Sequence, residues 1–204
     1  MLFRSSSTDL VTVLAGGNDL FMAMAKLQAE VQQGVPLQTA AQEAATTMGT
    51  AGAELAGYVK SLILANGASH VVVVNLPDVS VSPYALAYDA ATQGLVKTLA
   101  STFNTQLQNG LSGSAGVLTV DSFTALDNQV AAPAQYGVTN ATSPACDLTG
   151  ALAALPTSLV CTSQTLVSGD TSHYYFADSV HPTPYGYQLL AQLVSETMLK
   201  AGWL

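Results

Sequence analysis

The chain has 204 residues, of which 49% are hydrophobic and only 9% are charged, a composition that favours a well-buried folded protein and excludes a disordered one. Its 13 acidic and 5 basic residues give a formal net charge of -8, and no Lys/Arg cluster is present to neutralise a phosphate backbone, so nucleic acid is excluded as a partner. No apolar stretch approaches the roughly 20 residues of a membrane span. Residues 1–8 lack the apolar region of a secretory signal, so the localisation of this chain is left unknown.

Three short apolar runs predict β-strands. They occupy residues 10–15, 70–75 and 116–121 and are rich in Val and Leu. The hydrophobic residues are consecutive rather than alternating, which is typical of strands covered on both faces in a parallel sheet.

Apolar residues that recur every three or four positions predict the helices. One long amphipathic helix is expected at residues 36–62, opened by its proline and followed by Gly67 as a stop. A second is expected at residues 84–108. A third begins after Thr183, with Pro184 in its first turn, where the amide that proline lacks would be unpaired anyway.

Strands that alternate with helices predict an α/β fold with a parallel sheet and right-handed crossovers, in one domain over residues 1–204. Residues 133–171 interrupt the alternation, because they are rich in Pro, Ser, Thr and Gly and show no sustained period. We expect an irregular surface excursion there.

Both cysteines of the chain, Cys146 and Cys161, lie in this excursion. A disulfide between them would close a short loop and would imply an oxidising compartment, whereas two free thiols would suit a cytosolic protein. Since no histidine or third cysteine lies close by, the pair does not predict a metal site.

The first predicted strand runs into Gly16-Gly17-Asn18-Asp19, at the carboxyl end of the sheet, where open α/β proteins carry their reactive loops. An asparagine amide beside glycines can donate to the oxyanion that forms during ester hydrolysis. Asp19 is expected to order this loop through backbone amides. The alternative is a tight turn with Asn18 in a left-handed conformation.

A second candidate motif, Asp178-Ser179-Val180-His181-Pro182, lies just before the last helix. A carboxylate three residues before a histidine can set the tautomer of the imidazole and stabilise its positive charge. The alternative is a capping turn ahead of the helix.

The remaining candidate groups favour structural roles. His173 is expected to be a surface or capping group, and His70 a structural residue at the start of a strand. Asp78 is expected to form a turn after the second strand. Gly169-Asp170-Thr171 has the form of a nucleophile turn with threonine in place of serine, but it follows no strong strand.

The two motifs together resemble those of the SGNH/GDSL hydrolase superfamily, in its bacterial esterase and phospholipase/lecithinase branch. Gly16-Gly17-Asn18-Asp19 is similar to the G-x-N-D block and Asp178–Pro182 to the D-x-x-H-P block of that family. Residues 71–83, 133–146 and 176–187 also resemble that branch, so the likeness covers nearly the whole chain.

The resemblance implies a three-layer αβα fold of the flavodoxin-like type and hydrolysis of a small ester or lipid through a seryl intermediate. His181 would be the general base, Asp178 its orienting carboxylate and Asn18 an oxyanion donor, with Gly16 and Gly17 allowing close backbone approach. No cofactor or metal is implied, and full-length relatives would be secreted or periplasmic.

The chain departs from the family pattern in its nucleophile. The Gly-Asp-Ser block and the oxyanion glycine block precede the G-x-N-D block in the family, but only fifteen residues precede Gly16 here. The chain therefore resembles the C-terminal part of such an enzyme, without the first two strands of a sheet ordered 2-1-3-4-5. We expect the strand at residues 10–15 to be an open edge that pairs in a homo-oligomer or with a complementing N-terminal segment.

Two functions follow as alternatives. The first is a carboxylic ester hydrolase whose nucleophile cannot be identified in this chain. The second is a non-catalytic remnant that binds a ligand or serves as an interaction module.

Overall fold

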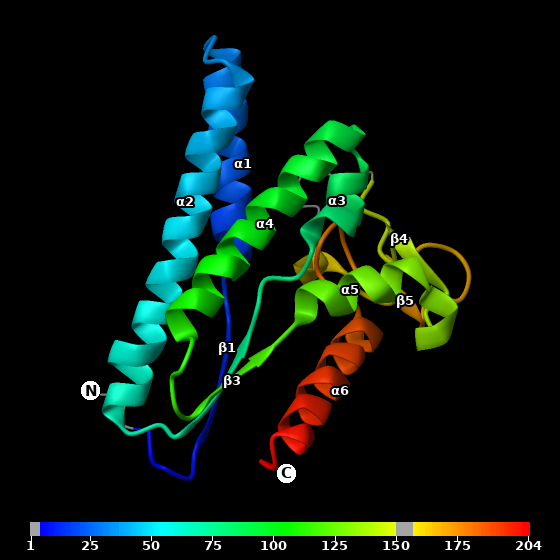
Figure 1. Cartoon of the computed structure of the whole chain (residues 1–204). Coiled ribbons are helices and arrows are strands. Elements are labelled where there is room, and N and C mark those ends of the chain that lie inside the picture. The colour runs from blue at the N-terminus through cyan, green and yellow to red at the C-terminus, as the bar shows by residue number, and fades with distance from the viewer. Residues whose placement is uncertain (1–4, 150–156) are drawn as a thin grey trace.

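The computed structural model describes residues 5–149 and 157–204, in which strands and helices alternate (Figure 1). The strands are β1 (Leu10–Leu14), β2 (His70–Val74), β3 (Val117–Val120), β4 (Asn140–Pro144) and β5 (Tyr174–Phe176). The α-helices are α1 (Gly17–Gln32), α2 (Leu37–Tyr58), α3 (Pro83–Leu86), α4 (Ala90–Leu111), α5 (Ser122–Ala131) and α6 (Pro184–Lys200). No helix of these two described ranges combines the length and the hydrophobicity of a membrane span.

The larger sheet has the strand order β1-β2-β3, and its strands are all parallel. Its central strand, β2, is covered on both faces. Val71 and Val73 pack into the cluster formed with α1, α2 and α4, whereas Val72 packs toward Met198 of α6. Helices thus lie on both faces of a parallel sheet, which confirms the predicted α/β architecture (Figure 1).

Helices α2 and α4 pack against each other at a separation that requires glycine. A Cβ atom on Gly52 would overlap the carbonyl oxygen of Phe103, and one on Gly110 would lie 2.5 Å from the Cβ of Ala56. The ring of Phe103, which is 1% exposed, also reaches the turn at Gly16. Phe103 of α4 therefore contacts both the crossing with α2 and the turn from which α1 begins.

Strand β1 is an edge of the larger sheet. Among the described residues it pairs only with β2, so the other side of its backbone has no strand partner there. Val11 and Val13 pack on the cluster beneath α1, α2 and α4, but Leu10 and Leu14, on the opposite face, are 48% and 50% exposed. The edge is consequently apolar and open on the side of α6.

The helices differ from the sequence-based predictions in three places. Neither α1 nor α5 was predicted. The single helix predicted at residues 84–108 is wrong, because Asp89 accepts a hydrogen bond from the amide of Thr92 (2.8 Å) and begins a new helix, α4, after α3. The helix predicted at residues 36–62 continues through a π-helical and a 3-10 turn and ends, as predicted, at Gly67, which has a φ of 102°.

The stretch at residues 133–171 is more regular than predicted, because β4 lies within it and pairs in parallel with β5. Ala141 and Phe176 from this small sheet pack with Leu189 of α6 in a second hydrophobic cluster. Residues 150–156 of the predicted excursion lie outside the described residues.

Candidate active site

Asp178 and His181 lie in the short loop between β5 and α6. The amide of Ala177 donates to the carbonyl oxygen of His181 (2.8 Å), which closes the loop on itself. Helix α6 follows at once, and the hydroxyl of its N-cap residue Thr183 accepts from the amide of Gly186 (3.1 Å). The loop is therefore held at both ends by hydrogen bonds.

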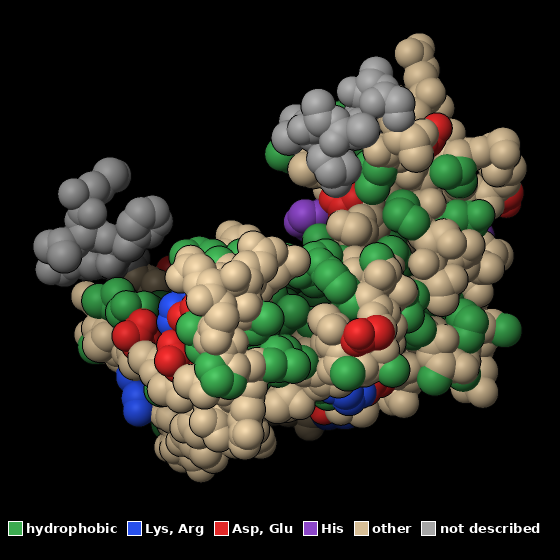
Figure 2. Space-filling model, turned by 90° about the horizontal axis from the view of Figure 1, so that it is seen from above, with side chains coloured by type: hydrophobic (Ala, Val, Ile, Leu, Met, Phe, Trp, Pro, Cys, Tyr) green, Lys and Arg blue, Asp and Glu red, His purple; other side chains and the backbone are tan. Residues whose placement is uncertain are grey.

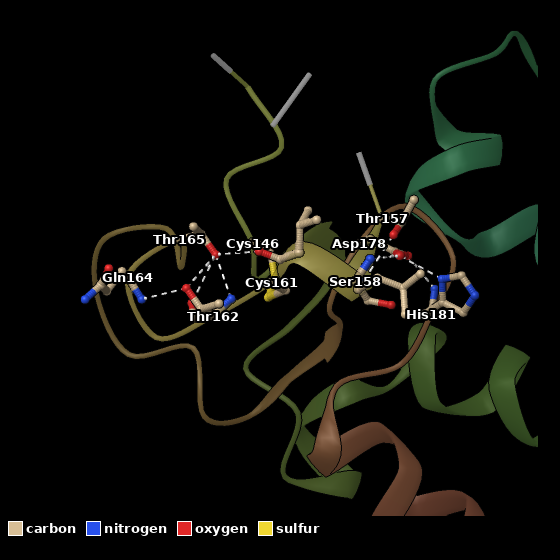
Figure 3. The surroundings of a disulfide bond; sticks show 11 residues. Cys146, Thr157, Ser158, Cys161, Thr162, Gln164, Thr165, Asp178 and His181 are labelled. Carbon is tan, nitrogen blue, oxygen red and sulfur yellow. Dashed lines mark hydrogen bonds and ion pairs between the residues drawn. A yellow bond between two sulfur atoms is a disulfide. The ribbon is translucent and has the colours of Figure 1, made fainter. Parts of the chain in front are cut away.

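The Asp178 carboxylate orients the His181 ring (Figure 3). Asp178 is 1% exposed, and its Oδ2 lies 2.7 Å from Nδ1 of His181. Oδ1 accepts from the amides of Val180 (2.8 Å) and His181 (2.7 Å), and Oδ2 also accepts from the amide of Ser158 (2.6 Å). Because an ionised carboxylate only accepts hydrogen bonds, Nδ1 of His181 carries the proton and Nε2 is left as a proton acceptor.

The lowered pKa of the Asp178 carboxyl should make the free energy of unfolding depend on pH in the acid range. Burial pushes its pKa upward, but the hydrogen bonds from His181, Val180 and Ser158 outweigh burial and hold the pKa below its ordinary value of 3.8. A pKa that is lower in the folded state stabilises the fold above the unfolded-state pKa, and this contribution is lost as the pH falls through the folded-state pKa. The free energy of unfolding, measured with urea between about pH 2 and pH 7, should therefore fall more steeply on acidification in the wild type than in Asp178→Asn. Parallel curves for the two proteins would contradict this assignment.

The turn between β1 and α1 carries the other predicted motif. Gly16 has a φ of 114°, and a Cβ atom there would lie 2.6 Å from the ring of Phe103, so the position requires glycine on two counts. Asn18 and Asp19 lie in the first turn of α1 and are exposed. The side chain of Asn18 makes no hydrogen bond with the described residues, which leaves its amide free to donate to a ligand.

Asn18 and His181 line one cavity of about 470 Å³, a volume typical of small-molecule sites. Gly16, Gly17 and Asp19 also line it, whereas Asp178 lies behind the His181 ring. Its apolar walls include Leu14, Leu76, Phe176, Leu190 and Leu193. Figure 2 shows hydrophobic side chains gathered around a hollow beside a histidine on this face.

Two serines line the cavity, but their hydroxyl groups are already hydrogen-bonded. Ser82 Oγ donates to the carbonyl of Val79 (2.7 Å), and Ser122 Oγ donates to the carbonyl of Asn75 (2.5 Å). Within residues 5–149 and 157–204, no serine hydroxyl hydrogen-bonds to His181. A nucleophile is therefore not identified among the described side chains.

The other histidines have structural surroundings away from this cavity. The ring of His173 packs edge-on against Tyr185 (4.4 Å between centroids), and that of His70 packs against Trp203 (4.9 Å). In the part of the chain that the structure describes, no three His, Cys, Asp or Glu side chains meet as metal ligands would.

A charge cluster around buried Asp78, which the sequence did not reveal, supports the cavity wall. Asp78 is fully buried, and Nζ of Lys97 lies 2.6 Å from its Oδ2 and 2.7 Å from Oδ2 of Asp127. Burial raises the pKa of Asp78, but hydrogen bonds to Asp127, Lys97 and Ser80 outweigh it and lower that pKa; burial and the neighbouring Asp78 raise the pKa of Asp127. Because Asp78 Oδ1 also accepts from the amide of Ser80 (2.9 Å), the cluster fixes the loop after β2 to α4 and α5.

Comparison with known proteins places the chain in a family. The family model described as GDSL-like Lipase/Acylhydrolase matches residues 3–194, a span that includes both the β1–α1 turn and the Asp178–His181 loop. No curated protein matches the chain. The match confirms the family that the two motifs predicted and supports a general hydrolase function. The chain belongs to the family of GDSL-like lipases and acylhydrolases.

Proposed function

We propose that this chain forms the base and oxyanion part of a carboxylic ester hydrolase that acts on short acyl esters or lipids. One observation carries the proposal: the His181 ring, oriented by Asp178 at 2.7 Å, and the free amide of Asn18 open into the same apolar cavity. The cavity walls suit an acyl chain, and the two polar groups suit its ester carbonyl.

The chemistry follows from the two polar groups. Nε2 of His181 accepts the proton of a nucleophilic hydroxyl while the hydroxyl oxygen attacks the ester carbonyl. Asp178 stabilises the imidazolium that forms, and Asn18 donates to the oxyanion. When the intermediate collapses, His181 returns the proton to the leaving alkoxide. Water then attacks the acyl-enzyme while His181 accepts its proton, and collapse of the second intermediate releases the acid and returns the proton to the nucleophilic hydroxyl.

The nucleophilic hydroxyl comes, in this proposal, from a complementing segment that pairs with the free edge of β1. A parallel strand at that edge would end beside Leu14, where the cavity begins. Side chains of that strand on the same face would pack beside the exposed Leu10 and Leu14. An edge strand with unpaired amides and carbonyls favours the addition of a strand.

The test is hydrolysis of a short-chain chromogenic ester, with an active-site phosphonate added and the labelled residue located by mass spectrometry. Light scattering on the same sample gives the oligomeric state. Turnover with the label on a serine of a co-purifying segment supports the proposal. A label on a serine of a monomeric chain would contradict the complementing strand, and a label on a second copy would replace it with a homo-oligomer.

The second candidate function is ligand binding without turnover. It is favoured by the observation that no described serine hydroxyl reaches His181. A chain that binds a non-hydrolysable ester analogue but shows neither turnover nor phosphonate label would establish this alternative.

A further inference from the structure

One hydrogen bond to the Asp178 carboxylate comes from outside its own loop. The amides of Val180 and His181 belong to the Asp178–His181 turn, whereas the amide of Ser158 is 20 residues away in sequence. It donates at 2.6 Å to Oδ2, the same oxygen that accepts from Nδ1 of His181 (Figure 3). Ser158 therefore acts on the carboxylate oxygen that holds the ring.

The turn that presents Ser158 has little packing of its own. It is the 3-10 turn η6 (Ser158–Val160), which contains no buried residue, and Leu159 is 89% exposed. The hydroxyl of Thr157 caps it by accepting from the amide of Leu159 (3.2 Å). Since no residue of this turn is fully buried, a covalent link nearby would add to what keeps it beside Asp178.

The disulfide between Cys146 and Cys161 supplies such a link. Cys161 directly follows the turn, and Cys146 is 2% exposed, with a Cα–Cα distance of 5.8 Å between them. The amide of Cys146 donates to the carbonyl of Ala177 (3.0 Å), the residue before Asp178. The disulfide thus ties the turn to the backbone that carries the orienting carboxylate of Asp178.

We propose that the backbone N–H of Ser158 positions the Asp178 carboxylate for its contact with His181. The Cys146–Cys161 disulfide holds the Ser158 turn beside Asp178. The inference rests on the proposed function, because it assigns a positioning group to the proposed base. With the donor removed, Oδ2 would have only the His181 ring as a partner, and the pKa of the carboxyl would rise toward its ordinary value.

The substitution Ser158→Pro removes this one donor. Ser158 is the first residue of its turn, where proline is well tolerated, and Thr157 has φ -125° and ψ 158°, the extended conformation that a residue before proline prefers. The matched control is Ser158→Ala, which keeps the N–H; the Ser158 hydroxyl makes no hydrogen bond with the described residues.

The readout is the pKa of the Asp178 carboxyl, titrated by carbon-13 NMR, together with kcat and KM for a short-chain ester. Ser158→Pro should raise that pKa and lower kcat about tenfold at unchanged KM, the effect of one hydrogen bond to a charged group. Ser158→Ala should keep the wild-type pKa. A Ser158→Pro protein with the wild-type pKa would overturn the positioning role.

The double variant Cys146→Ser/Cys161→Ser tests the tether. It should raise the Asp178 pKa in the same direction as Ser158→Pro, and a wild-type pKa in the folded double variant would show that the disulfide does not hold the turn. If the double variant does not fold, Ser158→Pro still decides the positioning role. Because the titration needs no turnover, it decides the positioning role on the isolated chain, whereas esterase activity of the preparation with its co-purifying segment decides the proposed function.

Discussion

Replacing His181 by alanine should lower kcat/KM for a short-chain ester by about 10²–10⁴-fold, the usual contribution of a general base. The variant keeps Asn18 and the cavity walls, so binding of a non-hydrolysable ester analogue should change little. The fold should be retained, since the His181 side chain is 54% exposed and the Asp178 carboxylate keeps its three backbone amide donors. Initial rates over a range of ester concentrations, with analogue binding by calorimetry, measure both effects.

His173→Ala is the matched control, because it makes the same chemical change outside the cavity, at a ring that packs on Tyr185. It should retain wild-type turnover. Equal turnover in wild type and His181→Ala would remove His181 from the mechanism and favour a base elsewhere. Loss of analogue binding together with turnover would instead indicate a damaged cavity.

The largest effect on stability is expected from Gly52→Ala. The added Cβ would overlap the carbonyl oxygen of Phe103, and because that atom is backbone it cannot turn aside as a flexible side chain can. α2 and α4 would have to separate, and overpacking of this kind costs about 3 kcal/mol or more, a large part of the stability of a typical domain. Urea denaturation at neutral pH, followed by circular dichroism, measures the loss.

Gly57→Ala, in the same helix, is the control. A Cβ atom on Gly57 meets nothing within 4 Å, so alanine should stabilise the helix by about 0.5–1 kcal/mol through its higher helix propensity. If both variants shifted stability in the same direction, close packing at Gly52 would not be the cause.

The parts of the fold that could be predicted are those with a strong local pattern. Continuous apolar runs located β1, β2 and β3, and the glycine at 67 marked a helix end because its positive φ suits that residue. The break before α4 was missed because one aspartate side chain, Asp89, overrides an otherwise helical pattern. α1 was missed because its first residues, Gly17-Asn18-Asp19, read as a turn, although Leu20 and Leu27 begin a regular apolar face.

The residues of the site likewise fall into those that local sequence patterns predict and those that they do not. The spacing of Asp178 and His181 allows contact within one turn, so this pair could be inferred from sequence. Ser158 could not, because it acts through a backbone amide that any residue except proline carries, in a stretch with no period. The contacts of Lys97 with Asp78 and Asp127 depend on how a loop and the helices α4 and α5 are placed in space, which local patterns do not encode.

The open edge of β1 has a practical consequence for handling the protein. Within the described residues, the outer edge of β1 offers a row of amides and carbonyls without a strand partner, flanked by exposed Leu10 and Leu14, and such an edge can pair with any extended chain, whether or not that chain completes a site. Partly unfolded neighbours in a concentrated sample offer such chains, and each addition presents a fresh edge to the next. Replacing Leu10 or Leu14 by lysine should therefore raise the amount of protein that stays soluble when the sample is concentrated and reduce the formation of dye-binding fibrils.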